Sequence, residues 1–130
     1  MTKKYQLSQE FLVLGPDQSA TPVAVSPSLY QDLDSRFNQF KQHSLVAIYS
    51  FESDWASWEI HPKGDEMVML LEGEITFVLN TDSGEQSQQL SNAGEYIVIP
   101  KNTWHTARTS TLAKVLFITP GEGTEHKSST

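Results

Sequence analysis

Beginning at Ser44, the chain carries a succession of short runs rich in Val, Ile, Phe, Thr and Trp, each ended by turn residues. The turns recur about every 8–12 residues, which is typical of all-β sandwiches and barrels. No helical pattern fits between the runs, which argues against a parallel β-α-β topology. The predicted strands span residues 44–52, 55–61, 66–71, 74–80, 86–90, 95–99, 103–109 and 112–118.

The N-terminal third has a different pattern. An apolar run at residues 11–14 is stopped by the turn sequence Gly15-Pro16-Asp17, which predicts a short strand. Ser26-Pro27 is typical of a helix start. Four apolar side chains then recur at helical spacing, at Leu29, Leu33, Phe37 and Phe40. We therefore predict one amphipathic helix over residues 27–42, which covers a face or edge of the sheet.

Charge and composition narrow the range of partners. The 130 residues carry a net charge of −7, with a sequence pI near 4.9, which argues against nucleic acid or an anionic membrane as a partner. The absence of cysteine excludes disulfides and thiolate metal sites. No signal-peptide pattern and no apolar run of roughly 20 residues is present, so we expect a cytoplasmic protein. We expect one domain over residues 1–130, with its core at 44–118 and a loosely held polar tail at 120–130.

Two segments contain candidate metal ligands. Glu59 and His61 are two residues apart in a predicted strand, so both project to the same side. A tight turn through residues 62–65 would return the chain at Glu66 and bring a second carboxylate toward the pair. His105 lies in another predicted strand, after a proline turn. Imidazole and carboxylate groups suit Zn, Fe, Mn, Ni or Co.

The segment Glu59-Ile60-His61-Pro62-Lys63-Gly64-Asp65-Glu66, continuing to Gly73, resembles the first motif of the cupin family, in which two histidines one residue apart precede a glutamate and a glycine. The segment from Gly94 to His105 resembles the second motif, a glycine, a proline, a glycine-bearing turn and a histidine. The resemblance implies a small single-domain cupin. Its fold would be all-β, an antiparallel jelly-roll β-barrel with one N-terminal amphipathic helix.

The same resemblance implies a divalent metal ion held by four residues that meet inside the barrel, namely Glu59, His61, Glu66 and His105. Each histidine taken alone is more often structural than a ligand. Glu59 stands where the family has histidine, and three roles are open for it. It is either a direct metal ligand, a base that contacts a ligand without binding the metal, or a polar residue that lines the pocket. Burying Glu66 unpaired at the start of an apolar run would be costly, and a cation would offset that cost.

Two further departures from the motifs concern neighbouring positions. Asn102 replaces the glycine of the second turn, and asparagine is the other residue that best tolerates positive φ. Thr109 replaces a frequent asparagine, on the predicted strand face of His105 and Ala107. The remaining histidines, His43 and His126, fit no ligand set.

The alternation of faces makes four apolar side chains candidates for the pocket lining, namely Val68, Leu70, Val98 and Ala107. Trp58 and Trp104, each next to a candidate ligand, should face away from the metal. The outward aromatic residues and open sheet also favour a homodimer.

The resemblance implies a small-molecule metalloenzyme of the dioxygenase or isomerase/lyase type, whose substrate the sequence leaves unknown. The fold supports two alternatives as well. One is a non-catalytic module that senses a metal or ligand, and the other is a structural dimer module with a vestigial site.

Overall fold

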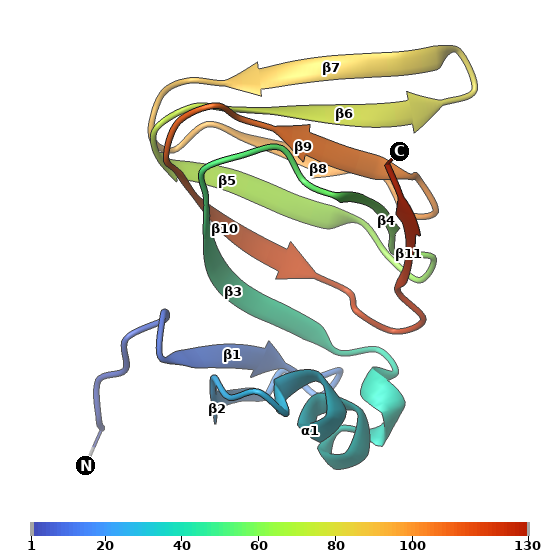
Figure 1. Ribbon diagram of the computed structural model, residues 1–130. Helices are drawn as coiled ribbons and strands as arrows, with labels where there is room; N and C mark the ends of the chain where they lie inside the picture. The colour runs from blue at the N-terminus through green and yellow to red at the C-terminus, as the bar shows by residue number, and fades with distance from the viewer. Residues whose placement is uncertain (1, 130) are drawn as a thin grey trace.

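The structure, a computed structural model, describes residues 2–129 as strands in two antiparallel sheets with one short α-helix (Figure 1). The strands are β1 (Glu10–Leu14), β2 (Ala20–Ala24), β3 (Ser44–Phe51), β4 (Ser57–Ile60), β5 (Glu66–Glu72), β6 (Ile75–Thr81), β7 (Gly84–Leu90), β8 (Tyr96–Ile99), β9 (His105–Arg108), β10 (Ala113–Thr119) and β11 (Glu125–Ser128). The helix is α1 (Leu29–Arg36), and a 3-10 turn (Asn38–Phe40) follows it.

The first sheet has the strand order β2-β1-β3-β10-β5-β8, and the second has the order β11-β4-β9-β6-β7. Within residues 2–129 no pairing joins one sheet to the other. The prediction of an all-β antiparallel protein with one N-terminal helix is therefore confirmed, and the jelly-roll connectivity stays a prediction. Each predicted run after residue 44 contains one observed strand, with ends that differ by a few residues.

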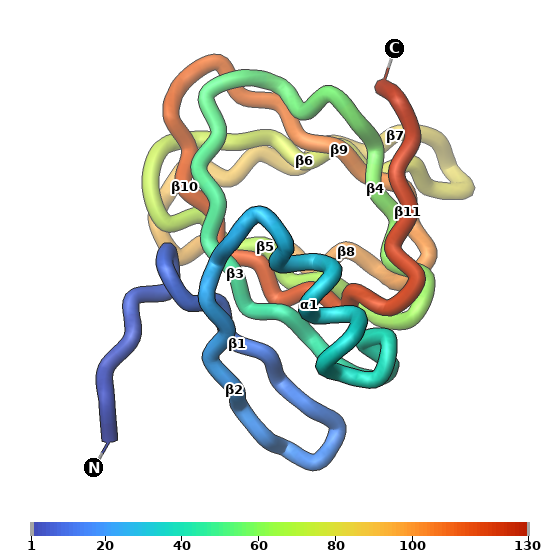
Figure 2. The backbone as a smooth tube through the Cα atoms, turned by 60° about the horizontal axis from the view of Figure 1, so that its bottom comes forward, coloured from blue at the N-terminus to red at the C-terminus, as the bar shows by residue number. Residues whose placement is uncertain are grey.

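Alternating side chains explain why the two sheets face each other. In β5 and β10 every second residue is buried, and Val68, Leu70, Val115 and Phe117 lie in one core with residues of β6, β7, β8 and β9. Because both sheets contribute to this core, their apolar faces pack together. Figure 2 shows the backbone from another side, with α1 near β3 and away from β7.

A second core lies under the helix. Leu29 and Leu33, the buried residues of α1, pack with β1, β2, β3 and Phe40, as the helical spacing predicts. The predicted helix, at residues 27–42, was too long. The helix ends at Arg36 because Asn38, Gln39 and Phe40 all have positive φ, so the chain leaves the helical path while Phe40 stays buried.

The C-terminal tail corrects a second expectation. Residues 120–130 were expected to be loosely held, but Glu125–Ser128 form β11, which pairs with β4 along four residues. All four side chains are exposed, so no hydrophobic pattern marks this strand. Backbone hydrogen bonds to β4 hold it, and β11 thereby covers the edge that β4 would otherwise present. The strand β2, whose inward side chains are few, was also not expected.

None of the helices formed by residues 2–129 has the length and apolar character needed to span a bilayer.

Candidate metal centre

Two connected turns bring the candidate ligands together. The backbone N–H of Lys101 donates to the Asp65 carboxylate over 2.8 Å, and the N–H of Asn102 donates to the His61 carbonyl over 2.9 Å. Asn102 has a φ of 60°, so asparagine does take the left-handed conformation that this turn needs. The turn before Glu66 and the turn before His105 are thereby fixed to each other.

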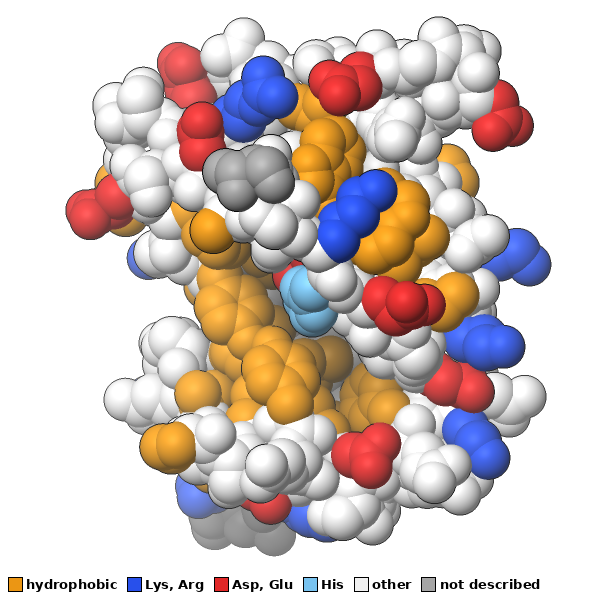
Figure 3. All heavy atoms as spheres, turned by 45° about the vertical axis from the view of Figure 1, so that its right-hand side comes forward, with side chains coloured by type: hydrophobic (Ala, Val, Ile, Leu, Met, Phe, Trp, Pro, Cys, Tyr) orange, Lys and Arg blue, Asp and Glu red, His pale blue; other side chains and the backbone are white. Residues whose placement is uncertain are grey.

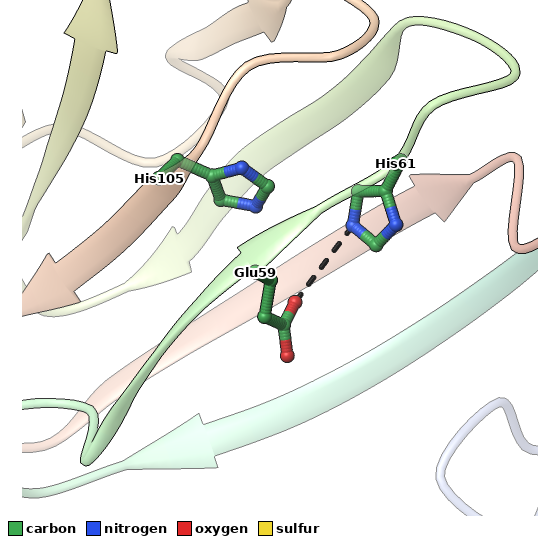
Figure 4. Close-up of side chains that lie close together, drawn as sticks. All are labelled: Glu59, His61 and His105. Carbon is green, nitrogen blue, oxygen red and sulfur yellow. Dashed lines mark ion pairs between the residues drawn. The ribbon is translucent and has the colours of Figure 1, made fainter. Parts of the chain in front are cut away.

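All four predicted residues lie close together. Nε2 of His105 is 3.1 Å from Oε1 of Glu66, and Nε2 of His61 is 3.4 Å from Oε2 of Glu66. Oε1 of Glu59 lies 3.7 Å from Nε2 of His61, the ion pair drawn in Figure 4. Ligand atoms of Glu59, His61 and His105 all lie within 4.8 Å of one another, which is close enough for one ion.

The outer nitrogens of both imidazoles are held by hydrogen bonds. Nδ1 of His105 lies 3.1 Å from the Thr103 carbonyl, which can only accept, so Nδ1 carries the proton. The Thr124 hydroxyl donates to the Gly121 carbonyl over 3.0 Å and so accepts from Nδ1 of His61 over 2.8 Å. In the neutral form of each ring, Nε2 is then the unprotonated nitrogen and points toward Glu66, which is the form that binds a metal.

The buried polar atoms of this cluster fit a divalent ion. Among the described side chains, Nε2 of His61, Nε2 of His105 and Oε1 of Glu66 are buried without a partner in hydrogen-bond geometry. His105 is 0% exposed and Glu66 is 2% exposed, so both side chains are shielded from bulk water. Leaving such atoms unpaired is costly, and a shared cation would bind all three. Two nitrogens and two carboxylates form a donor set for Zn, Fe, Mn, Ni or Co.

The electrostatics of the cluster also favour a cation. Burial alone would raise the pKa of Glu66, but the close imidazoles of His105 and His61 outweigh it and lower the pKa to about 2. Burial alone would lower the pKa of His105, but Glu66 outweighs it and raises the pKa. The Thr119 hydroxyl donates to the same carboxylate over 2.6 Å. Glu66 is therefore ionised, and a proton or a metal ion is attracted to the space between it and His105.

Two residues beside the ligands were not expected from the sequence. His126 lies opposite Glu59 in the β11–β4 pairing, and Glu59 lies opposite His105 in the β4–β9 pairing. Nε2 of His126 is 3.0 Å from Oε2 of Glu59. His126 and Thr124 thus each contact one candidate ligand, although His126 was expected to take no part in such a site. Thr124 directly precedes β11 and His126 lies in it, and the polar sequence of β11 has no pattern that predicts a strand.

A pocket of about 1190 Å³ opens over the cluster, between the sheets and α1. Glu59, His61 and Glu66 line it. Figure 3 shows one face of the molecule, with a band of apolar side chains running along a hollow and a histidine beside it. The site is therefore open to a small molecule on the side of this pocket.

Three of the four apolar residues expected to face inward do so, but they belong to the core between the sheets, and none of the four lines the pocket. Val68, Leu70 and Ala107 are buried, but Val98 is 51% exposed. Glu66 pairs with Ile99 and Val68 pairs with Ile97, so these two isoleucines share the inner face of β8 and Val98 points outward. Thr109 lies beyond the end of β9, and its hydroxyl is within hydrogen-bond distance of two backbone carbonyls, those of Glu74 at 2.9 Å and Thr111 at 2.7 Å. In agreement with the expected outward face, the ring of Trp104 contacts the ammonium group of Lys127.

Comparisons with known proteins agree with this geometry. A family model described as a cupin domain matches residues 51–119, just over half of the chain. A cupin-2 domain containing protein from Shewanella frigidimarina NCIMB 400 is similar in structure, with a TM-score of 0.51 and 26% identity over 59% of this chain and 70% of that one. No curated protein matches the sequence.

Two more distant structures show the fold alone. Bacillus subtilis oxalate decarboxylase, with its Mn(II) centres, has a TM-score of 0.52 at 15% identity, over 66% of this chain and 24% of that one. Hydroquinone 1,2-dioxygenase from Sphingomonas sp. TTNP3, with 4-hydroxybenzoate bound, has a TM-score of 0.50 at 16% identity, over 58% of each chain. On the family match, the two paired turns and the clustered motif residues, the chain belongs to the cupin family.

Proposed function

We propose that the protein is a metal-dependent enzyme that acts on a small oxygenated organic molecule, by dioxygenation or by an isomerase or lyase reaction. In this proposal Glu59, His61, Glu66 and His105 hold one divalent ion at the base of the pocket. Such an ion supplies Lewis-acid or oxygen chemistry. The manganese centres of the decarboxylase and the reaction of the dioxygenase show which chemistries related folds carry.

One observation supports the proposal most strongly. Three buried atoms, Nε2 of His61, Nε2 of His105 and Oε1 of Glu66, converge with no partner in hydrogen-bond geometry among the described residues. A purely structural cluster would satisfy these atoms with each other or with the backbone. Here the backbone and Thr124 satisfy the outer nitrogens only, and the inner atoms are left for a cation.

The protein's own groups have separate tasks in this proposal. Thr103 and Thr124 keep both imidazoles in the metal-binding tautomer. The Thr119 hydroxyl orients the carboxylate of Glu66. Glu59 is 27% exposed and faces the pocket, so it is the proposed ligand that an entering substrate would reach first.

The test is the metal content of protein purified without a metal-chelating tag. We expect about one ion per chain in the unsubstituted protein, measured by elemental analysis, and less than roughly a tenth of that in His61→Ala and His105→Ala. His43→Ala is the matched control, because His43 contacts Phe37, Phe40 and the Lys41 carbonyl and is not part of the cluster.

Oxygen uptake and substrate turnover with the Fe(II)- and Mn(II)-loaded protein then separate the two reaction types. If the folded protein holds less than stoichiometric metal and reconstitution does not raise it, the proposed function is wrong.

A further inference from the structure

The charged side chains that line the pocket over the cluster are acidic. Five carboxylates line it, those of Asp34, Glu52, Asp54, Glu59 and Glu66. Within residues 2–129, no Lys or Arg lines it. A divalent ion held by Glu59 and Glu66 would cancel only these two charges, so three negative charges remain around the pocket. An anionic ligand would enter against this field, whereas an uncharged one would not.

The walls of the pocket are aromatic. Six aromatic side chains line it, those of Tyr30, Phe40, Tyr49, Phe51, Trp55 and Phe117. Ring centroids are 5.4 Å apart for Phe51 and Trp55, 5.9 Å apart for Tyr49 and Phe117, and 6.2 Å apart for Trp55 and His105, all in tilted or edge-on contact. The aromatic wall is therefore continuous from the pocket to a candidate metal ligand.

Two features of this wall bear on the ligand. The hydroxyls of Tyr30 and Tyr49 are hydrogen-bonded to each other, and burial raises the pKa of both phenols, so both stay uncharged at neutral pH. Aromatic rings take up a further ring in the same tilted or edge-on arrangement. A pocket of about 1190 Å³ has ample room for one, since pockets that bind drug-sized ligands are roughly 300–1,000 Å³ in volume.

We propose that this pocket takes an uncharged aromatic alcohol or phenol, with its oxygen toward Glu66 and His61 and its ring against the wall formed by Phe51, Trp55 and Phe117, and that it excludes small carboxylates. This inference rests on the proposed function for the direction of the oxygen. Its preference for an uncharged ring follows from the lining alone and is independent of the metal.

The test compares benzyl alcohol with benzoate, two probes with the same ring and a different charge. Binding is measured by titration calorimetry or ligand-observed NMR, with the chelator-stripped protein and with the Mn(II)-loaded protein. We expect benzyl alcohol to bind at least tenfold more tightly than benzoate to the stripped protein, where no metal ion offsets the charge of the carboxylates. Metal loading should reduce this preference without reversing it. Oxalate carries negative charge and has no ring. It should bind more weakly than benzyl alcohol, or at most equally tightly, to both the stripped and the Mn(II)-loaded protein.

Ala56→Lys adds a cation to the lining at an exposed position and should raise the affinity for benzoate relative to benzyl alcohol by at least threefold. Ser87→Lys on β7 is the matched control, because it adds the same charge outside the pocket and should leave the ratio unchanged. Equal or tighter binding of benzoate, or no binding of benzyl alcohol to either form, would overturn the inference. A protein that takes up no metal but still prefers benzyl alcohol would contradict the proposed function and leave this inference standing.

Discussion

At the scale of single residues, the hydrogen bonds behind the two imidazoles decide how the site can be used. Nδ1 of His61 donates to the Thr124 hydroxyl and Nδ1 of His105 donates to the Thr103 carbonyl. Each bond fixes the tautomer and the direction of the ring, so each Nε2 is ready for a ligand. The acceptor for His105 is a backbone carbonyl, whereas the acceptor for His61 is the side chain of Thr124 and can be removed by substitution.

Replacing Thr124 with valine keeps the shape of the side chain and removes the acceptor for His61. We expect metal affinity to fall roughly 10–100-fold, because the ring loses the bond that holds its tautomer and direction. Competition with a coloured chelator measures the change. Thr124→Ser keeps the hydroxyl and should stay within about threefold of the unsubstituted protein. If the valine variant binds metal equally well, Thr124 has no part in positioning His61.

The residue scale also shows what could be read from the sequence. Glu59, His61, Glu66 and His105 could be placed because two spaced motifs mark them, and Asn102 because few residue types tolerate its φ of 60°. Val98 was assigned to the wrong face, since one residue of register decides the side on which a strand residue lies. The roles of Thr124 and His126 could not be predicted, because the residues that they contact are more than 60 positions away in the sequence.

At the scale of elements, one row of residues runs across three strands. His126 of β11, Glu59 of β4 and His105 of β9 lie opposite one another in successive pairings. Residues opposite each other in a sheet project to the same face. The outermost strand of the second sheet therefore contributes to the candidate centre, and the C-terminal segment also carries Thr124 toward it.

Removing residues 121–130 tests this contribution. The four side chains of β11 are exposed, so we expect the truncated chain to keep its core and its far-UV circular dichroism spectrum. We expect its metal affinity to fall further than that of Thr124→Val, because it loses Thr124 and His126 together. Lys127→Ala is the control, since Lys127 contacts Trp104 on the other face and should leave metal affinity within about twofold. Unchanged affinity after truncation would show that β11 only covers an edge.

The turn between β5 and β6 gives a test of the fold. Gly73 has a φ of 85°, and a Cβ there would lie 2.0 Å from the Leu112 carbonyl oxygen. Gly84 has a φ of 102° with nothing within 4 Å of its Cβ position. We expect Gly84→Ala to lower the free energy of unfolding by about 1–2 kcal/mol through backbone strain. Gly73→Ala should cost at least about 2 kcal/mol more, because backbone must move. Equal costs in urea unfolding would mean that the close contact is relieved elsewhere.

The predicted bounds of the strands agree with the structure where apolar and polar residues alternate clearly. They disagree where backbone geometry or backbone pairing alone determines the structure. The strands β5, β6 and β10 have a buried inner face and were expected near their observed positions. The helix ended early because three consecutive residues after it have positive φ, which the apolar spacing of Phe37 and Phe40 does not reveal. The strand β11 depends on β4 alone and carries no pattern of its own.

At the scale of the whole molecule, two sheets with a shared apolar core hold a buried polar cluster at one end of a pocket. The core anchors two of the strands that carry candidate ligands, since Val68 and Leu70 of β5 and Ala107 of β9 lie in it. The pocket that leads to them has an acidic and aromatic lining. The proposed metal binding and the proposed ligand preference therefore rest on different observations, and each can be tested without the other.

The most direct test of the account is X-ray diffraction from metal-loaded crystals, recorded at the absorption edges of manganese, iron, nickel and zinc. We expect one anomalous peak per chain, about 2.0–2.3 Å from Nε2 of His61, Nε2 of His105 and a carboxylate oxygen of Glu66, with Glu59 on the pocket side of the ion. An anomalous peak at any other place, or a folded protein whose cluster binds no metal at any of these edges, would contradict the account.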